Sequence, residues 1–143
     1  MDREQLIEEV MNAIQKIRAR HRERRHSEES NSGRGMILNY LYAHGGQATP
    51  GELRDHMKVT TPRVTVILNE LEQEKLIVRE IADYDRRRVC VNLTEHGRQS
   101  VEQRRMRRRE QIGRLVDRLG EEDTQALLRI CRVLDDLDED TKR

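Results

Sequence analysis

The sequence of 143 residues has no tryptophan and no phenylalanine, and it has only three tyrosines. Hydrophobic residues make up 34% of the chain and charged residues 38%, so apolar side chains are scarce for a monomer of this length. Because a thin core of this kind usually gains burial from a second chain, the composition predicts an oligomer. The apolar residues recur at regular helical and strand intervals, which separates this sequence from disordered charged chains.

Long hydrophobic runs and clustered metal ligands are also missing. No run approaches the roughly 18 apolar residues that span a bilayer, and the first residues lack the basic-then-apolar order of a signal peptide, so we expect a cytoplasmic protein without membrane contact. Cys90 and Cys131 match neither a CxxC nor a metal-ligand spacing, which favours reduced thiols. The histidines show no HxxxH or HExxH spacing, and we find no phosphate loop and no nucleophile with a partnered base. The sequence therefore predicts no metal, no cofactor and no catalytic residue.

Charge is strongly segregated along the chain, although the formal net charge is only +1. Residues 86–118 hold 11 basic and 4 acidic side chains, whereas residues 119–143 hold 4 and 8. This division indicates that one surface faces a polyanion. Taken alone it is weak evidence, because a charge run is more often a solvated helix face.

The first third of the chain predicts two helices joined by a linker. Residues 3–25 carry an amphipathic stripe, and residues 26–35 are polar and rich in serine and glycine, which indicates the linker. A short apolar segment follows and ends at Gly45-Gly46, as helices often do. The stripe consists of Leu6, Val10, Ile14 and Ile17, and the apolar segment contains Met36, Ile37, Tyr40 and Leu41.

The pattern of a helix-turn-helix follows. Thr49, Pro50 and Glu52 form a capping box before a short helix over residues 50–57. Thr61 and Pro62 repeat the cap-then-proline start, and a very short turn joins the two helices. The second helix has one apolar face, made of Val64, Ile67, Leu68 and Leu71. Two helices, a tight turn and an apolar inner face predict a helix-turn-helix, whose second helix can enter the major groove of DNA.

The periodicity then changes from helical to strand-like. Residues 76–82 and 88–93 are rich in β-branched side chains, and the second segment alternates apolar and polar residues. They predict a β-hairpin whose tip, residues 83–88, is a polar and basic loop. Such a hairpin beside a helix-turn-helix is a wing.

The carboxy-terminal third predicts two further helices. One covers residues 94–119, with Thr94 as its cap, and Gly120 separates it from the last helix. The last helix is expected to direct Leu127, Ile130, Cys131, Leu134 and Leu137 toward a core. The predicted fold is mainly α with a small β-hairpin wing. We expect one domain over residues 1–143, in which 1–26 and 99–143 are dimerisation helices and 33–98 form a winged helix-turn-helix DNA-binding lobe.

Several spaced motifs over residues 49–98 resemble the MarR family of winged-helix transcription regulators. They are Val64-Thr65, Leu68 to Leu71 followed by Glu72, Asp85-Arg86-Arg87, and Leu93-Thr94 through Gly97. The resemblance implies a homodimeric regulator of double-stranded DNA, a repressor that a small aromatic or phenolic effector releases. Where this family usually has glycine, the chain has Lys75, which predicts a different turn after the recognition helix.

The recognition helix supplies the candidates for base contacts. With its apolar face turned inward, Pro62, Val66 and Asn69 point outward, flanked by Thr61, Arg63 and Thr65. Arg63 is suited to guanine, Asn69 to adenine, and Thr65 or Val66 to a thymine methyl group. Thr61 can also offer a phosphate contact at the helix start, although capping alone explains it.

The wing supplies the candidates for backbone contacts. Wing residues with like charges repel one another, and a nearby polyanion would offset this repulsion. The residues concerned are Arg86, Arg87 and Arg88. The resemblance implies that Arg87 reaches the minor groove or phosphates, and that Asp85 braces the wing. Two alternatives stay open: a solvated loop held by an internal ion pair, and a winged-helix protein-interaction module without specific DNA binding.

Overall fold

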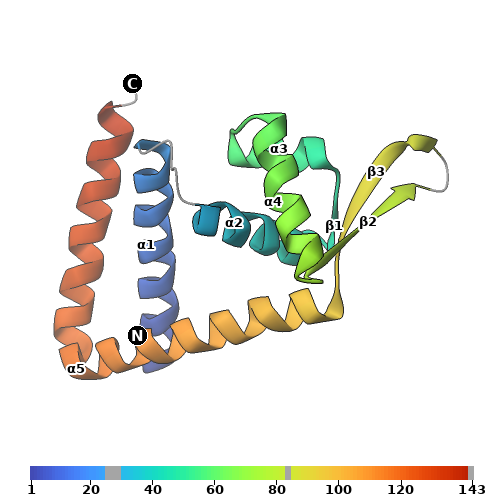
Figure 1. Ribbon diagram of the computed structural model, residues 1–143. Coiled ribbons are helices and arrows are strands. Elements are labelled where there is room, and N and C mark those ends of the chain that lie inside the picture. Colours follow the sequence, from blue (N-terminus) through green and yellow to red (C-terminus); the bar gives the residue numbers. More distant parts are fainter. Residues whose placement is uncertain (25–29, 83–84, 142–143) are drawn as a thin grey trace. The chain divides into compact units, whose positions relative to one another are not determined.

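The computed structural model describes residues 1–24, 30–82 and 85–141, and of these it leaves out the side chains of residues 21–24, 30–32, 82 and 85–87. Figure 1 shows the elements, which are α1 (Arg3–Arg24), α2 (Ser30–Ala43), β1 (Gln47–Ala48), α3 (Pro50–Met57), α4 (Thr61–Gln73), β2 (Ile77–Ala82), β3 (Asp85–Leu93) and α5 (Glu95–Thr141). They confirm the predicted fold class. The chain divides into two compact units: a winged unit, residues 27–104, and a helical unit, residues 1–26 and 105–143.

The winged unit is built on a three-stranded antiparallel sheet in the order β1-β3-β2. Its core is formed by α2, α3, α4, the sheet and the first turns of α5. Strand β1 was not predicted, since two residues are too few to show a periodicity. It pairs Gln47 with Asn92 and Ala48 with Val91, and so attaches the segment before α3 to the wing.

The predicted linker was partly wrong, because α2 already begins at Ser30. Gly33 is buried where α2 crosses α4, and a Cβ atom there would lie 2.8 Å from the Cδ1 atom of Ile67. Here the glycine permits close helix packing rather than a flexible connection. The end of the helix was predicted correctly: Gly45 and Gly46 follow it with φ values of 73° and 83°.

The wing differs from the prediction at its tip. Strand β3 begins at Asp85, so residues 85–88 belong to a strand rather than to a loop. The predicted alternation of buried and exposed residues holds close to the core, where Val91 is buried, but Val89 is exposed. The strands therefore extend beyond the core at Ile81 and Val89, whose side chains are exposed.

The helical unit contains α1 and most of α5, which bends at Gly120 with a φ of 79°. Figure 1 shows the second part of α5 turning back beside α1. Its core consists of Leu6, Ile7, Val10, Val116 and Leu128. No helix among the described residues is long and apolar enough to cross a membrane.

Within this chain, the prediction for the last helix was wrong for three of its five residues. Of the residues expected to face a core, Cys131 is buried, whereas Ile130, Leu134 and Leu137 are 47% to 59% exposed. The buried face contains Thr124 and Leu128 beside Cys131. The helix carries two apolar stripes, and the structure turns the less apolar one toward α1.

Candidate nucleic-acid interface

A three-residue turn sets the angle between α3 and α4. The capping box at Thr49 is confirmed: its hydroxyl accepts from the Glu52 amide at 3.1 Å. At the other end of α3, Lys58 adopts a left-handed conformation with φ 56° and ψ 45°, and its N–H donates to the Arg54 carbonyl at 2.9 Å. The turn is therefore closed by backbone hydrogen bonds, as helix ends of this type are.

The cap of α4 was assigned one residue too late. Thr60 has the extended backbone of a cap, and its hydroxyl accepts from the Arg63 amide at 3.4 Å. Thr61 is the first residue of the helix and is exposed. Two successive threonines before a proline made both positions plausible caps, because either hydroxyl lies near the helix start.

Helix α4 has a buried face and an exposed face. Its four predicted inward residues, Val64, Ile67, Leu68 and Leu71, are all buried. The opposite face exposes Pro62, Thr65, Val66 and Asn69, with Val66 53% exposed, while Arg63 is half-buried. This helix is thus anchored on one side and available to a partner on the other.

Polar contacts organise the first turn of this exposed face. The Thr65 hydroxyl donates to the Thr61 carbonyl at 3.1 Å, so its methyl group remains for apolar contact. Arg54 of α3 donates from Nη1 to the Thr61 hydroxyl at 3.2 Å. Arg54 was not among the residues predicted from the sequence, although a basic residue in the first helix of a helix-turn-helix is a usable signal for a phosphate contact.

A second arginine missed by the sequence analysis joins α4 to the wing. Arg79 of β2 donates to Asn69 and Glu72, both on α4, at 2.5 Å (Nη2 to Oδ1) and 3.1 Å (Nε to Oε2). The hydrogen bonds from Arg79 lower the pKa of the Glu72 carboxyl, so Glu72 stays ionised at neutral pH. This cluster fixes the recognition helix relative to the wing.

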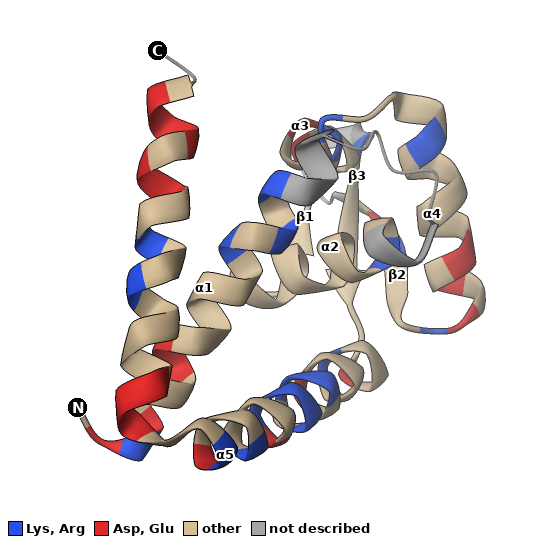
Figure 2. Ribbon diagram, turned by 90° about the vertical axis from the view of Figure 1, so that its left-hand side faces the viewer, with Lys and Arg blue, Asp and Glu red and all other residues tan. Residues whose placement is uncertain are grey.

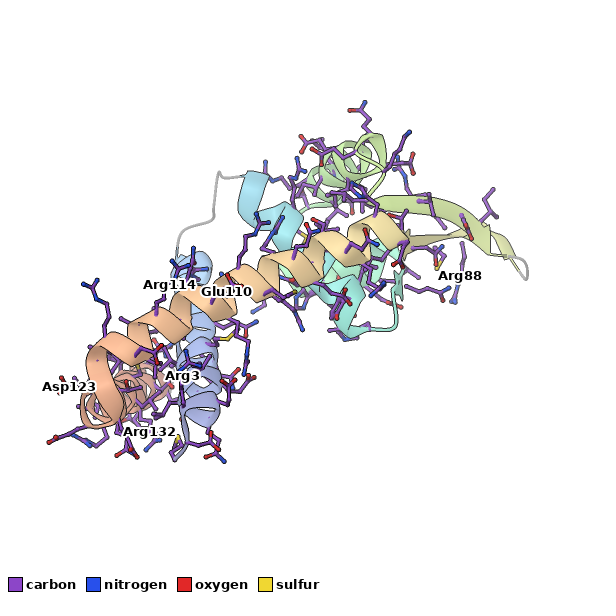
Figure 3. The ribbon with its side chains drawn as sticks, turned by 90° about the horizontal axis from the view of Figure 1, so that it is seen from below. Arg3, Arg88, Glu110, Arg114, Asp123 and Arg132 are labelled. Carbon is purple, nitrogen blue, oxygen red and sulfur yellow. The ribbon has the colours of Figure 1, made fainter. Side chains whose placement is uncertain are left out.

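The wing candidates lie on β3. Arg88 is exposed and is labelled in Figure 3. Asp85, Arg86 and Arg87 also belong to β3, but their side chains lie outside those that the structure describes. The backbone of β3 nevertheless places all four residues in one strand, at the outer end of its pairing with β2, where Ala82 is opposite Asp85.

Among the residues that the structure describes, no group of three or more His, Cys, Asp or Glu side chains could hold a metal ion. Cys90 is half-buried on β3 and Cys131 is buried in α5, and both are free thiols.

Comparisons with known proteins agree with this geometry. Residues 33–88 match the family model of the MarR family. The uncharacterized HTH-type transcriptional regulator YwhA of Bacillus subtilis (strain 168) is 35% identical over 104 residues, which cover 73% of this chain and 74% of YwhA.

Solved structures give the same result. MepR, a transcription regulator of the Staphylococcus aureus multidrug efflux pump MepA, is 29% identical with a TM-score of 0.65, over 91% of this chain and 90% of MepR. A mutant of S. aureus MepR bound to an oligodeoxyribonucleotide is 31% identical with a TM-score of 0.60, over the same shares of the two chains. With its exposed recognition helix and its wing, this chain belongs to the MarR family, a family of transcription regulators and not of enzymes, and it is a helix-turn-helix DNA-binding transcriptional regulator.

Proposed function

We propose that the chain binds a near-palindromic operator in double-stranded DNA as a homodimer and represses the gene that the operator controls. The observation that carries the proposal is the two-faced α4, whose apolar residues are buried while its outer residues are exposed. A helix anchored in this way can lie in the major groove without losing core packing. The helix-turn-helix of the family supports this use of α4.

Helix α4 is proposed to read bases. Arg63 in its first turn is the candidate for a bidentate contact with guanine. Val66 and the methyl group of Thr65 are suited to thymine methyl groups. Thr61 and Pro62 lie at the amino terminus of the helix, where the helix dipole favours a phosphate and the Thr61 hydroxyl can contact it.

The wing is proposed to bind the DNA backbone or the minor groove through Arg86, Arg87 and Arg88, with Asp85 as the brace that orients the strand. The exposed position of Arg88 supports this role. Three consecutive arginines concentrate positive charge on one strand, and DNA phosphates attract such a concentration of charge. A wing that docks to protein has no need of this charge.

The helical unit is proposed to form the dimer. Its last helix has an apolar stripe that no other described residue covers. The stripe consists of Ile130, Val133, Leu134 and Leu137, which are all exposed. Exposed apolar stripes of this size usually mark a protein interface. A symmetric dimer presents two equivalent recognition helices, so we expect half-sites about one helical turn, roughly 10 base pairs, apart.

Repression follows if the dimer occupies an operator that overlaps a promoter, because it then excludes the polymerase. The family resemblance implies that a small aromatic or phenolic effector releases the dimer, and the proposal includes this step. To release the dimer, the effector would have to bind more tightly to a conformation of the protein that does not fit the operator.

A gel shift with the DNA upstream of the protein's own gene tests the proposal, with footprinting of the complex and a panel of aromatic acids. We expect a complex that random DNA does not compete away, protection of two symmetric half-sites, and release by at least one acid. Binding without preference over random DNA contradicts the operator, and protection of one asymmetric half-site contradicts the dimer. A complex that resists every acid contradicts the effector.

A further inference from the structure

The contact between Arg79 and Asn69 fixes the direction of an amide on the exposed face of α4. Arg79 Nη2 lies 2.5 Å from Asn69 Oδ1. A guanidinium has only donors, so the atom of Asn69 that faces it must be the oxygen. The Nδ2 group, with its two donors, therefore points away from Arg79.

Arg79 itself is held by the same helix. Glu72 Oε2 accepts both from Arg79 Nε at 3.1 Å and from the Arg79 backbone N–H at 3.2 Å, and Oε1 lies 3.4 Å from Nη2. The side chain of Arg79 is 29% exposed and that of Glu72 is 41% exposed. The Glu72 carboxylate accepts two hydrogen bonds from the guanidinium and one from the Arg79 backbone, so the guanidinium is oriented and can orient Asn69 in turn.

This orientation bears on which base Asn69 can recognise. Bidentate recognition of adenine needs the amide oxygen to accept from N6 while the amide nitrogen donates to N7. Here Arg79 occupies one of the two lone pairs of the oxygen, and the positive guanidinium beside the second lone pair disfavours the amino group of adenine, which is also a donor. Guanine presents two acceptors, N7 and O6, to the major groove, and both suit an amide that offers donors.

We propose that Arg79 is a positioning residue that sets the base preference of Asn69, directing it to guanine rather than to the adenine expected from its residue type. The inference rests on the proposed function, in which the exposed face of α4 meets the major groove. It assigns Arg79 a role in specificity without a direct base contact.

The test measures affinity for operators in which each base pair of both half-sites is changed in turn to the three others. The proteins are wild type, Asn69→Ala, Arg79→Met and the double variant. Asn69→Ala identifies the base pair that Asn69 contacts, because preference is lost there. At that pair we expect wild type to prefer guanine to adenine by roughly tenfold. Arg79→Met should remove this preference or reverse it, and should change nothing further when Asn69 is already alanine.

Arg98→Met is the matched control for the loss of a positive charge. Arg98 is an exposed arginine of the winged unit that pairs with Glu95 and Glu102 and does not contact Asn69. It should leave the base preference unchanged. If Arg98→Met alters the preference as much as Arg79→Met does, the effect is one of charge, and the proposal is overturned.

Two further outcomes overturn the proposal. One is an Arg79→Met protein that keeps the guanine preference, and the other is an Asn69→Ala protein with unchanged preferences at every base pair. Neither affects the proposed function, which fails separately if the wild type does not prefer the operator to random DNA in the same titrations.

Should Arg79→Met not fold, Asn69→Asp provides the test. It keeps an oxygen for Arg79 and removes the donors, so it should bind the guanine operator at least tenfold more weakly than wild type. An unchanged affinity for that operator overturns the proposal.

Discussion

The winged unit and the helical unit differ in how many apolar side chains they bury. Among the described residues, thirteen buried side chains form the core of the winged unit, whereas five form that of the helical unit. The winged unit gathers four kinds of element around one centre, namely α2, the α3–α4 pair, the sheet and the start of α5. It completes its core within one chain.

The helical unit instead has a small apolar core, several exposed ion pairs between its helices, and exposed apolar residues. Arg3 pairs with Asp117 at 2.7 Å, and Arg109 pairs with Glu4 and Glu8 at 2.6 and 3.0 Å; Figure 3 labels Arg3. Exposed pairs of this kind contribute little to stability in water. The comparison teaches that one unit completes its apolar core within the chain, whereas the other leaves an apolar stripe exposed, which we propose forms the dimer interface.

Charge is also divided along α5. Figure 2 shows basic residues along the first part of α5 and acidic residues near the end of its last part. Arg109 belongs to the basic stretch but is already bound by two carboxylates of α1. Part of the basic charge therefore holds the helical unit together and is not available to DNA.

The largest expected effect is the loss of the dimer in Leu134→Glu. The substitution places a charge in the apolar stripe that the proposed dimer buries. An unpaired charge buried in an interface is strongly unfavourable. We expect sedimentation to show a monomer at micromolar concentration, and affinity for the operator to fall by two orders of magnitude or more because the second half-site is lost.

Arg132→Glu, at an exposed position on a different face of the same helix, is the control and should remain dimeric. A Leu134→Glu protein that stays dimeric would mean that another face forms the interface and that the two units differ less than we propose.

Gly97→Ala should destabilise the winged unit. A Cβ atom at Gly97 would lie 2.1 Å from the Leu76 carbonyl oxygen and 2.7 Å from the Leu93 Cδ1 atom. Since backbone cannot move aside cheaply, we expect a loss of about 3 kcal/mol in the free energy of unfolding, measured by urea denaturation at a fixed protein concentration. Gly51→Ala, where the nearest atoms are 3.9 Å away, should change stability by about 1 kcal/mol or less. Equal effects of the two substitutions would contradict the packing.

Lys75→Gly should stabilise the winged unit. Lys75 has a φ of 62°, so the recognition helix ends in the left-handed turn that glycine favours, and the different turn expected from the lysine was wrong. The Thr94 hydroxyl donates to its carbonyl at 2.7 Å and so holds this conformation. We expect a gain of about 0.5–1 kcal/mol from thermal unfolding. Lys16→Gly in α1 should lose about 1 kcal/mol instead, and a loss in both variants would contradict the strained turn.

The smallest effect concerns acid. The hydrogen bonds of Arg3 lower the pKa of Asp117, and those of Arg109 lower the pKa of Glu4. A carboxyl with a lowered pKa stabilises the folded state above its ordinary pKa, and this stabilisation is lost as the pH falls through the lowered value. Asp117→Asn should therefore reduce the drop in melting temperature between pH 7 and pH 3 at low salt. A drop identical to that of wild type would show that the pair contributes nothing.

Local signals explain what could be predicted from the sequence. The capping box at Thr49, the apolar face of α4, the cap at Thr94 and the break at Gly120 all depend on residues a few positions apart. The Thr94 hydroxyl, for example, accepts from the Gly97 amide at 3.0 Å. Such interactions can be recognised from spacing because the chain itself keeps the partners close.

The features that could not be predicted depend on contacts between residues far apart in the sequence. Either stripe of the last helix could have faced α1, and only packing decides that Leu128 is buried while Leu134 is exposed. The glycines before Met36 indicated flexibility, yet Gly33 is there for contact with Ile67 of α4. The hydrogen bond between Arg79 and Asn69 joins a strand to a helix, and no rule of sequence spacing predicts such a contact.

The central claim, that α4 reads bases while the wing binds the DNA backbone, is tested most directly by the binding of Arg63→Ala and Arg87→Ala to operator and random DNA at several salt concentrations. Arg63→Ala should cost about 1–3 kcal/mol in each half-site of the operator and much less on random DNA. Arg87→Ala should weaken binding to both DNAs alike and reduce the salt slope by about 1 for each phosphate that the wing no longer neutralises. Both effects should roughly double in a dimer, since each substitution is present twice. Arg98→Ala is the control for the removal of a positive charge. Unchanged affinities and an unchanged salt slope in Arg87→Ala would contradict the account, because the wing would then not bind DNA.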